Sequence, residues 1–125
     1  MKDDAIILIV DSDETSSILL QEILFMVLPS DCNYQILSIP YGTEAIGLCC
    51  KQRPKAVFTE IRLKDMDGFR LVKHIKESYP DIPVIIETAI PWEYVKQQAC
   101  ECCCDGYLTK PLDIKNLYKF LQSVF

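Results

Sequence analysis

The sequence predicts an α/β protein in which five strands alternate with five helices around a parallel sheet. Short apolar runs recur along the chain, and each is followed by a segment whose apolar residues recur at helical spacing. The chain has 125 residues, half of them hydrophobic, which suits one domain over residues 1–125 with a core of its own. Because parallel crossovers are nearly always right-handed, this alternation predicts a doubly wound, three-layer (βα)5 sandwich.

The first half of the chain contains the first two strand–helix units. Residues 5–10 are an unbroken apolar run, which is typical of a central strand buried on both faces. Apolar residues at helical spacing then predict a helix that stops at Pro29. Residues 34–39 predict the second strand and residues 43–52 the second helix.

The second half repeats the alternation three times. Strands are predicted at residues 56–60, 84–88 and 106–109. The helices between and after them are predicted to end before Pro80, to span residues 92–101, and to carry an apolar stripe formed by Ile114, Leu117, Tyr118 and Leu121.

Composition narrows the functional classes. The net charge of −5 argues against a nucleic-acid surface, which is usually basic. The six apolar residues before Asp11 are too few for a signal peptide, and no stretch approaches membrane-spanning length. We therefore expect a cytoplasmic protein with reduced thiols and no direct contact with nucleic acid or membrane.

Four of the five predicted strands deliver a polar residue to the same edge of the sheet. These residues are Asp11, Glu60, Thr88 and Lys110. In an open parallel sheet ligands bind outside the carboxyl ends of the strands. The pattern predicts a pocket with two carboxylates, a hydroxyl and an ammonium group, in which the carboxylates would suit a hard cation such as magnesium.

Several short motifs, in this order and spacing, resemble the receiver domain of bacterial response regulators. They are Leu8-Ile9-Val10-Asp11, Met66-Asp67-Gly68, Thr88-Ala89 and Gly106-Tyr107-Leu108-Thr109-Lys110-Pro111. The resemblance covers nearly the whole chain. It implies a flavodoxin-like fold with strand order 2-1-3-4-5 and a two-component phosphorelay signalling role, not an enzyme.

The resemblance also implies roles for single residues. Asp11 matches the first member of an acidic pair that holds magnesium, while Thr88 and Lys110 match the residues that contact the phosphoryl group. Tyr107 matches the aromatic residue whose rotamer reports activation. The peptide bond between Lys110 and Pro111 matches one that is typically cis.

Two residues depart from the family pattern. Glu60 stands where the family has the aspartate that accepts the phosphoryl group, and its side chain reaches roughly 1.5 Å further. Ser12 stands where the family has the second acidic residue, so a magnesium site would be weakened by one negative charge. Because phosphoryl transfer depends on positioning, the pair predicts an atypical receiver that acts through protein–protein interaction.

Without a metal, Glu60 is expected to form an ion pair with Lys110 in the pocket. The permanent charge of Glu60 would then hold the domain toward an active-like state; the competing hypothesis is a domain locked inactive. The alternative function is a conventional magnesium-dependent receiver that still accepts a phosphoryl group. Expected partners are a histidine kinase or another signalling protein, or a second copy bound through the face made by the fourth helix, fifth strand and fifth helix.

Seven cysteines include the cluster Cys100, Cys102, Cys103 and Cys104. Consecutive cysteines do not easily present all their sulfurs to one tetrahedral zinc, and no C-x2-C pair repeats. Packing as small apolar residues is therefore the favoured interpretation, with a metal or redox sensor as a third functional alternative. Cys103 falls where the family has a glycine, at a helix end that favours positive φ.

Overall fold

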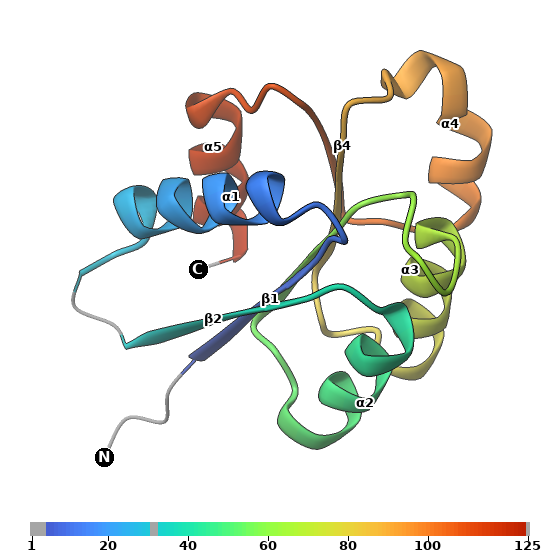
Figure 1. The fold of residues 1–125 in the computed structure, drawn as a ribbon, viewed down its shortest axis with the longest axis horizontal. Helices are drawn as coiled ribbons and strands as arrows, with labels where there is room; N and C mark the ends of the chain where they lie inside the picture. Colours follow the sequence, from blue (N-terminus) through green and yellow to red (C-terminus); the bar gives the residue numbers. More distant parts are fainter. Residues whose placement is uncertain (1–4, 31–32, 125) are drawn as a thin grey trace.

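The computed structural model describes residues 5–30 and 33–124. Five parallel strands form one sheet in the order β2-β1-β3-β4-β5 (Figure 1). The strands are β1 Ala5–Val10, β2 Tyr34–Ile39, β3 Ala56–Thr59, β4 Val84–Thr88 and β5 Gly106–Thr109. The predicted fold class and strand order are confirmed, and β3 ends one residue earlier than predicted.

Five helices connect the strands and cover both faces of the sheet. They are α1 Glu14–Val27, α2 Gly42–Gln52, α3 Gly68–Ser78, α4 Trp92–Glu101 and α5 Ile114–Val124. α1 and α5 lie on one face, and α2, α3 and α4 lie on the other (Figure 1). None of the helices in these two ranges is long and apolar enough to span a membrane.

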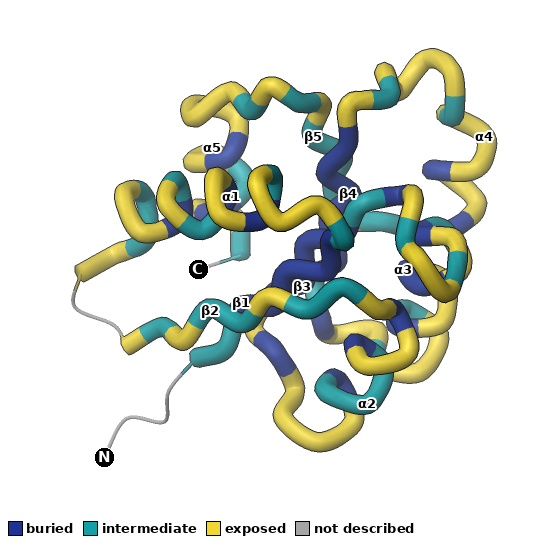
Figure 2. The backbone as a smooth tube through the Cα atoms, viewed as in Figure 1, coloured by how far each residue is buried: buried dark blue, intermediate teal, exposed yellow. Residues whose placement is uncertain are grey.

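The core consists of two apolar layers, one on each face of the sheet. Successive side chains of a strand point to opposite faces, so Leu8 and Val10 pack toward α2 and α3 while Ile7 and Ile9 pack toward α1 and α5. β3 and β4 are buried along their length and β1 over residues 7–10, whereas β2, at the edge, is half-exposed (Figure 2). A fully apolar central strand follows from this burial on both faces.

At the carboxyl edge of the sheet, aspartate side chains accept hydrogen bonds from the first N–H groups of helices α1, α2 and α3. Asp13 caps α1 by accepting from the backbone N–H groups of Thr15 and Ser16, and Asp67 caps α3. Asp65 reaches across from the loop after β3 and accepts from the N–H groups at the start of α2. The same residues that form the loops therefore hold the helix ends in place.

The burial of α5 differs from the sequence-based expectation, whereas α4 spans the predicted residues 92–101. In α5 only Leu117 and Leu121 are buried; Ile114 and Tyr118, predicted in the same apolar stripe, are about half-exposed. In α4 the backbone departs from helical geometry at Val95, and only Ala99 is buried. α4 is thus held to the core by few side chains.

Candidate functional site

The ends of β1, β3 and β5 bring three of the predicted residues together. The Lys110 ammonium lies 3.3 Å from Asp11 Oδ2 and 3.2 Å from Glu60 Oε1. Asp11 is buried, and the side chains of Glu60 and Lys110 are mostly covered. The predicted ion pair between Glu60 and Lys110 is confirmed, and Asp11 shares the same ammonium group.

Both oxygens of the Glu60 carboxylate are engaged. Oε1 pairs with Lys110, and Oε2 accepts a hydrogen bond of 2.6 Å from the backbone N–H of Ile61. The longer side chain of glutamate therefore folds back onto its own loop. Two partners therefore fix the Glu60 carboxylate.

Gly68 allows this loop to approach α3. A Cβ atom at residue 68 would collide with the carbonyl oxygen of Glu60 and would lie 2.8 Å from the Cα atom of Ile61. The N–H group of Gly68 donates to the Ile61 carbonyl at 2.6 Å. The glycine of the Met66-Asp67-Gly68 motif is thus required by close backbone approach, directly behind Glu60.

A third carboxylate, Glu87, belongs to the same cluster and was missed by the sequence analysis. Its Oε1 lies 3.6 Å from the Lys110 ammonium, and the side chain is only 3% exposed. Burial raises the pKa of Glu87 to about 7, although Lys110 opposes the rise. A charged residue within the apolar run Val84-Ile85-Ile86-Glu87-Thr88 was the signal that could have identified it.

Lys110 is the only cation that these carboxylates contact among the described residues. Burial works against its charged form, but attraction to Glu87, Asp11 and Glu60 outweighs burial and raises its pKa. Lys110 is followed by a cis peptide bond to Pro111, as predicted. One ammonium group therefore neutralises part of the charge of three carboxylates. Asp11, Glu60, Glu87 and Lys110 together are called the ion cluster.

The donor set at this edge does not fit a magnesium ion well. Asp11 Oδ2 pairs with Lys110, and its Oδ1 accepts from the N–H of Asp13. Asp13 itself caps α1, and Ser12 offers a neutral oxygen. Among residues 5–30 and 33–124, no group of three or more His, Cys, Asp or Glu side chains is arranged to hold a metal. The Lys110 ammonium already supplies the cation in this cluster.

The side chains of Thr88 and Tyr107 are directed to the loop before α4. The Thr88 side chain is buried, and its hydroxyl accepts from the N–H of Ile90 at 3.4 Å, without a hydrogen bond to Glu60. The Tyr107 hydroxyl donates to the Ile90 carbonyl at 2.5 Å. Burial, followed by the nearby Glu60 charge, raises the pKa of Tyr107 to about 12. Both side chains thus bond to the loop between β4 and α4.

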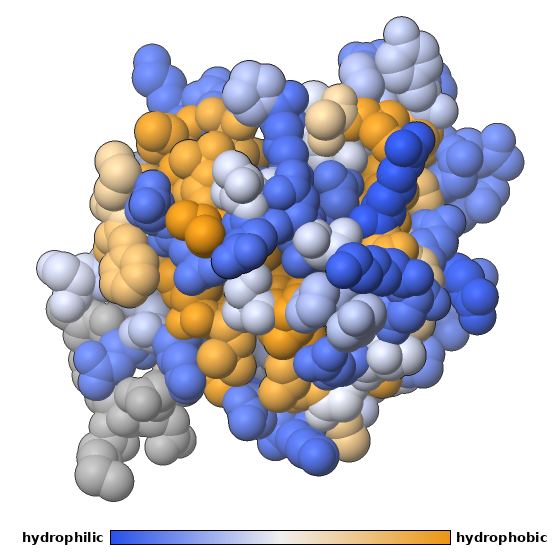
Figure 3. Space-filling model, viewed as in Figure 1, coloured by the Kyte–Doolittle hydropathy of each residue, from blue (hydrophilic) through white to orange (hydrophobic). Residues whose placement is uncertain are grey.

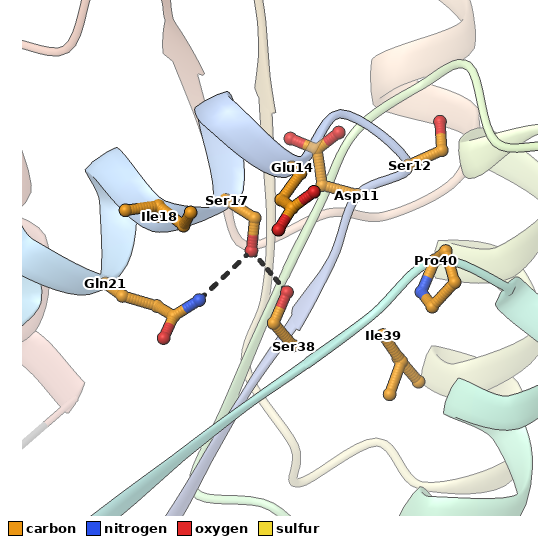
Figure 4. Close-up of a pocket in the computed structure, with 9 residues that line it drawn as sticks. All are labelled: Asp11, Ser12, Glu14, Ser17, Ile18, Gln21, Ser38, Ile39 and Pro40. Atoms are coloured by element: carbon orange, nitrogen blue, oxygen red, sulfur yellow. Dashed lines mark hydrogen bonds between the residues drawn. The ribbon is translucent and has the colours of Figure 1, made fainter.

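A cavity of about 400 Å³, lined by polar and apolar side chains, lies beside the cluster, between α1 and β2 (Figure 4). Ser17 and Ser38 hydrogen-bond to each other across it, and the Gln21 amide donates to Ser17 at 3.3 Å. Asp11 and Ser12 lie at its end nearest the ion cluster. The cavity therefore adjoins the site on the side opposite to Tyr107.

The fold, the site and the motifs define a receiver domain. Residues 7–122 match the family model of the response regulator receiver domain, and the chain belongs to this family. Receiver domains are signalling modules of two-component systems.

Individual relatives agree with this assignment. The heme response regulator HssR of Staphylococcus aureus (strain JH9) is 38% identical over 85 residues, which are 68% of this chain and 38% of that protein. The match thus spans well under half the length of the curated relatives.

Solved structures show the same fold. The signal receiver domain of an HD domain-containing protein from Pseudomonas fluorescens Pf-5 superposes with a TM-score of 0.84 at 28% identity, over 99% of this chain and 88% of the other. The chemotaxis protein CheY4 of Vibrio cholerae has a TM-score of 0.80 at 25% identity, over 98% and 100% of the two chains.

Proposed function

We propose that this domain is an atypical receiver that signals through protein–protein interaction without aspartyl phosphorylation of the usual kind. The observation that carries the proposal is the state of Glu60, whose two carboxylate oxygens are held by Lys110 and by the Ile61 N–H. A nucleophile for phosphoryl transfer needs a free oxygen in line with the donor. Glu60 is longer than aspartate and is already bonded at both oxygens.

The negative charge of the ion cluster also supports the proposal. A receiver takes up a phosphoryl group, which brings about −1.5 to −2 charges. Here Asp11, Glu60 and Glu87 surround Lys110 without any added group. The permanent charge of Glu60 would provide part of the negative charge that phosphorylation normally provides.

The position of Tyr107 supports an active-like state, whereas that of Thr88, whose hydroxyl bonds to Ile90 and not to Glu60, does not. The Tyr107 hydroxyl bonds to the Ile90 carbonyl, so the ring lies against the loop between β4 and α4 and does not extend into solvent. Tyr107 occupies the place of the aromatic residue whose rotamer reports activation in the family. We infer that the domain presents this surface constitutively.

The partner is expected to be a histidine kinase or another signalling protein of the cytoplasm. Receiver domains interact with such proteins. Apolar side chains are exposed over α1 and α5 (Figure 3), and they include Ile18, Leu19, Phe25, Met26, Ile114 and Tyr118. On α4, Tyr94 is 79% exposed and Trp92 is 40% exposed. These two surfaces support partner binding, and the homodimer through α4, β5 and α5 stays a prediction.

Incubation with magnesium and acetyl phosphate, followed by intact mass measurement, tests the proposal. We expect the wild-type mass to be unchanged. A Ser12→Asp/Glu60→Asp variant restores both family residues and is expected to gain one phosphoryl group, which shows that the assay works on this scaffold.

A conventional receiver gives a different result. It would gain a phosphoryl group as wild type and lose this gain in a Glu60→Gln variant. That outcome would replace the proposal with phosphorylation on Glu60. Gain of phosphate in both wild type and Glu60→Gln would place the acceptor on another residue, and would equally overturn the proposal.

A further inference from the structure

We propose that Cys102 and Cys104 form a dithiol that a small peroxide converts to an intramolecular disulfide. The site lies in the turn between α4 and β5 and includes no residue of the ion cluster. It goes beyond the proposed signalling function and stands or falls independently of it.

The backbone brings the two thiols to one point. Cys102 Sγ lies 3.2 Å and Cys104 Sγ 3.5 Å from the same atom, the carbonyl oxygen of Ala99. Between them Cys103 has φ = 62°, in the left-handed region, which turns the chain at the end of α4. The side chain of Cys103 is exposed, whereas those of Cys102 and Cys104 turn inward together.

The pair favours one thiolate. In the protonated pair both thiols donate to Ala99, and after one ionises the other donates to it. The hydrogen bond from Cys104 lowers the pKa of Cys102 to about 7, against the effect of burial. The same hydrogen bond raises the pKa of Cys104, which keeps its proton. A thiolate beside a protonated thiol is the arrangement that disulfide formation needs.

Access to Cys102 depends on movement of the end of α4. Cys102 is 3% exposed, while Cys104 is partly exposed. Within α4 only Ala99 is buried, and the helix is interrupted at Val95. Elements with few buried contacts open locally at low free-energy cost. We therefore expect peroxide to oxidise the Cys102–Cys104 pair more slowly than an alkylating reagent modifies the exposed thiols of Cys50, Cys100 and Cys103.

The chemistry balances with hydrogen peroxide as the oxidant. The Cys102 thiolate attacks one peroxide oxygen, the O–O bond breaks, and a sulfenic acid and hydroxide form. The Cys104 thiol then displaces the hydroxyl group from sulfur, which forms the S–S bond and water. The two cysteines lose two electrons, and the peroxide is reduced to the level of water.

Disulfide formation would act on α4. It removes both thiol donors from the Ala99 carbonyl, and Ala99 is the buried residue that attaches α4 to the core. Tyr107 lies three residues after Cys104, in strand β5, and its hydroxyl bonds to the loop before α4. Oxidation is therefore expected to change hydrogen exchange in residues 92–107 more than in α1.

The test uses the full chain with four cysteines replaced, Cys32→Ser, Cys50→Ser, Cys100→Ser and Cys103→Ser. This variant keeps Cys49, which is buried, together with Cys102 and Cys104. After hydrogen peroxide we expect a loss of two hydrogens by intact mass, no covalent dimer, and a fall from three titratable thiols to one under denaturing conditions. A reductant should restore all three.

Two further variants serve as controls. Adding Cys102→Ser or Cys104→Ser should abolish the loss of two hydrogens, with folding checked by circular dichroism. Peptide mapping of peroxide-treated wild type, which needs no variant, should show a link between residues 102 and 104. Oxygen addition without a link, a link to Cys49, a covalent dimer, or stoichiometric zinc bound by the untreated pair would each overturn the proposal.

Discussion

Glu87 is a carboxylate placed in the sheet itself, one residue before the end of β4. The three strand residues before it are apolar. Its only ion pair in the described part of the chain is with Lys110, which Asp11 and Glu60 also contact. Burial disfavours the charged form of Glu87 more than attraction to Lys110 favours it, so the pKa of Glu87 rises to about 7. The protein therefore keeps a buried carboxyl group whose ionisation is unfavourable beside Lys110.

This shift predicts a pH-dependent effect of Glu87→Gln. The pKa of Glu87 is 4.5 when unperturbed and about 7 in the folded protein, so the folded state binds more protons between these values. Stability from this group falls as pH rises from about 4.5 to about 7. We expect Glu87→Gln to raise the free energy of unfolding by about 1–3 kcal/mol at pH 8, and by less than about 0.5 kcal/mol at pH 4.5.

Denaturant titrations at the two pH values measure this difference. Glu77→Gln, at an exposed position on α3, is the matched control and should change stability little at either pH. An equal gain from Glu87→Gln at both pH values would mean that packing, and not ionisation, causes the effect.

At the scale of elements, the connection between β3 and α3 fixes where Glu60 points. α3 begins at Gly68, and its first turn packs onto the backbone of Glu60 and Ile61. Asp67 caps α3, while Asp65 in the same loop caps α2. The N–H groups of Thr43 and Gly42 lower the pKa of Asp65, although burial opposes them. One short loop thus aligns two helices with the site.

Gly68→Ala is expected to destabilise the protein by about 1–3 kcal/mol. The new Cβ would collide with backbone atoms of Glu60 and Ile61, which cannot move aside by a change of side-chain rotamer. It should also displace Glu60 from Lys110. Thermal or denaturant unfolding measures the first effect, and chemical shifts of the Ile61 and Lys110 amides report the second.

Gly47→Ala in α2 is the matched control. A Cβ at residue 47 has no atom within 4 Å, so alanine should stabilise the helix by up to about 1 kcal/mol. If both variants were stabilised, the close approach at Gly68 would not constrain the loop.

At the scale of the whole molecule, the sheet connects the ion cluster to the α4 surface. Glu87 and Thr88 are adjacent in β4, and one faces Lys110 while the other bonds to Ile90. Tyr107 in β5 bonds to the same loop residue. The last two residues of β4 therefore link the ion cluster to the loop before α4.

Magnesium should stabilise the molecule little, because Lys110 already pairs with the carboxylates that a metal would need. We expect about 10 mM magnesium chloride to raise the melting temperature by less than about 2 °C, as a weakly bound ligand does. The Ser12→Asp/Glu60→Asp variant should show a clearly larger rise. A large magnesium-dependent shift in wild type would show that the metal displaces Lys110.

Sequence patterns predicted the strands, the helices and the pairing of Glu60 with Lys110 because these depend on local periodicity and on which residues end parallel strands. They did not predict the burial of Glu87, because a single charge in an apolar run says nothing of its partner. Nor did the helical stripe show that Ile114 and Tyr118 stay half-exposed, since exposure depends on how α5 packs beside α1.

The sequence by itself determined the fold class and the family, and it predicted that Glu60 and Ser12 depart from the family pattern. Only the tertiary structure decided that one ammonium group serves three carboxylates, and that Cys102 and Cys104 share one carbonyl oxygen. These arrangements depend on distances between side chains from separate strands or across a turn. Such distances are set when the chain packs, and no local pattern encodes them.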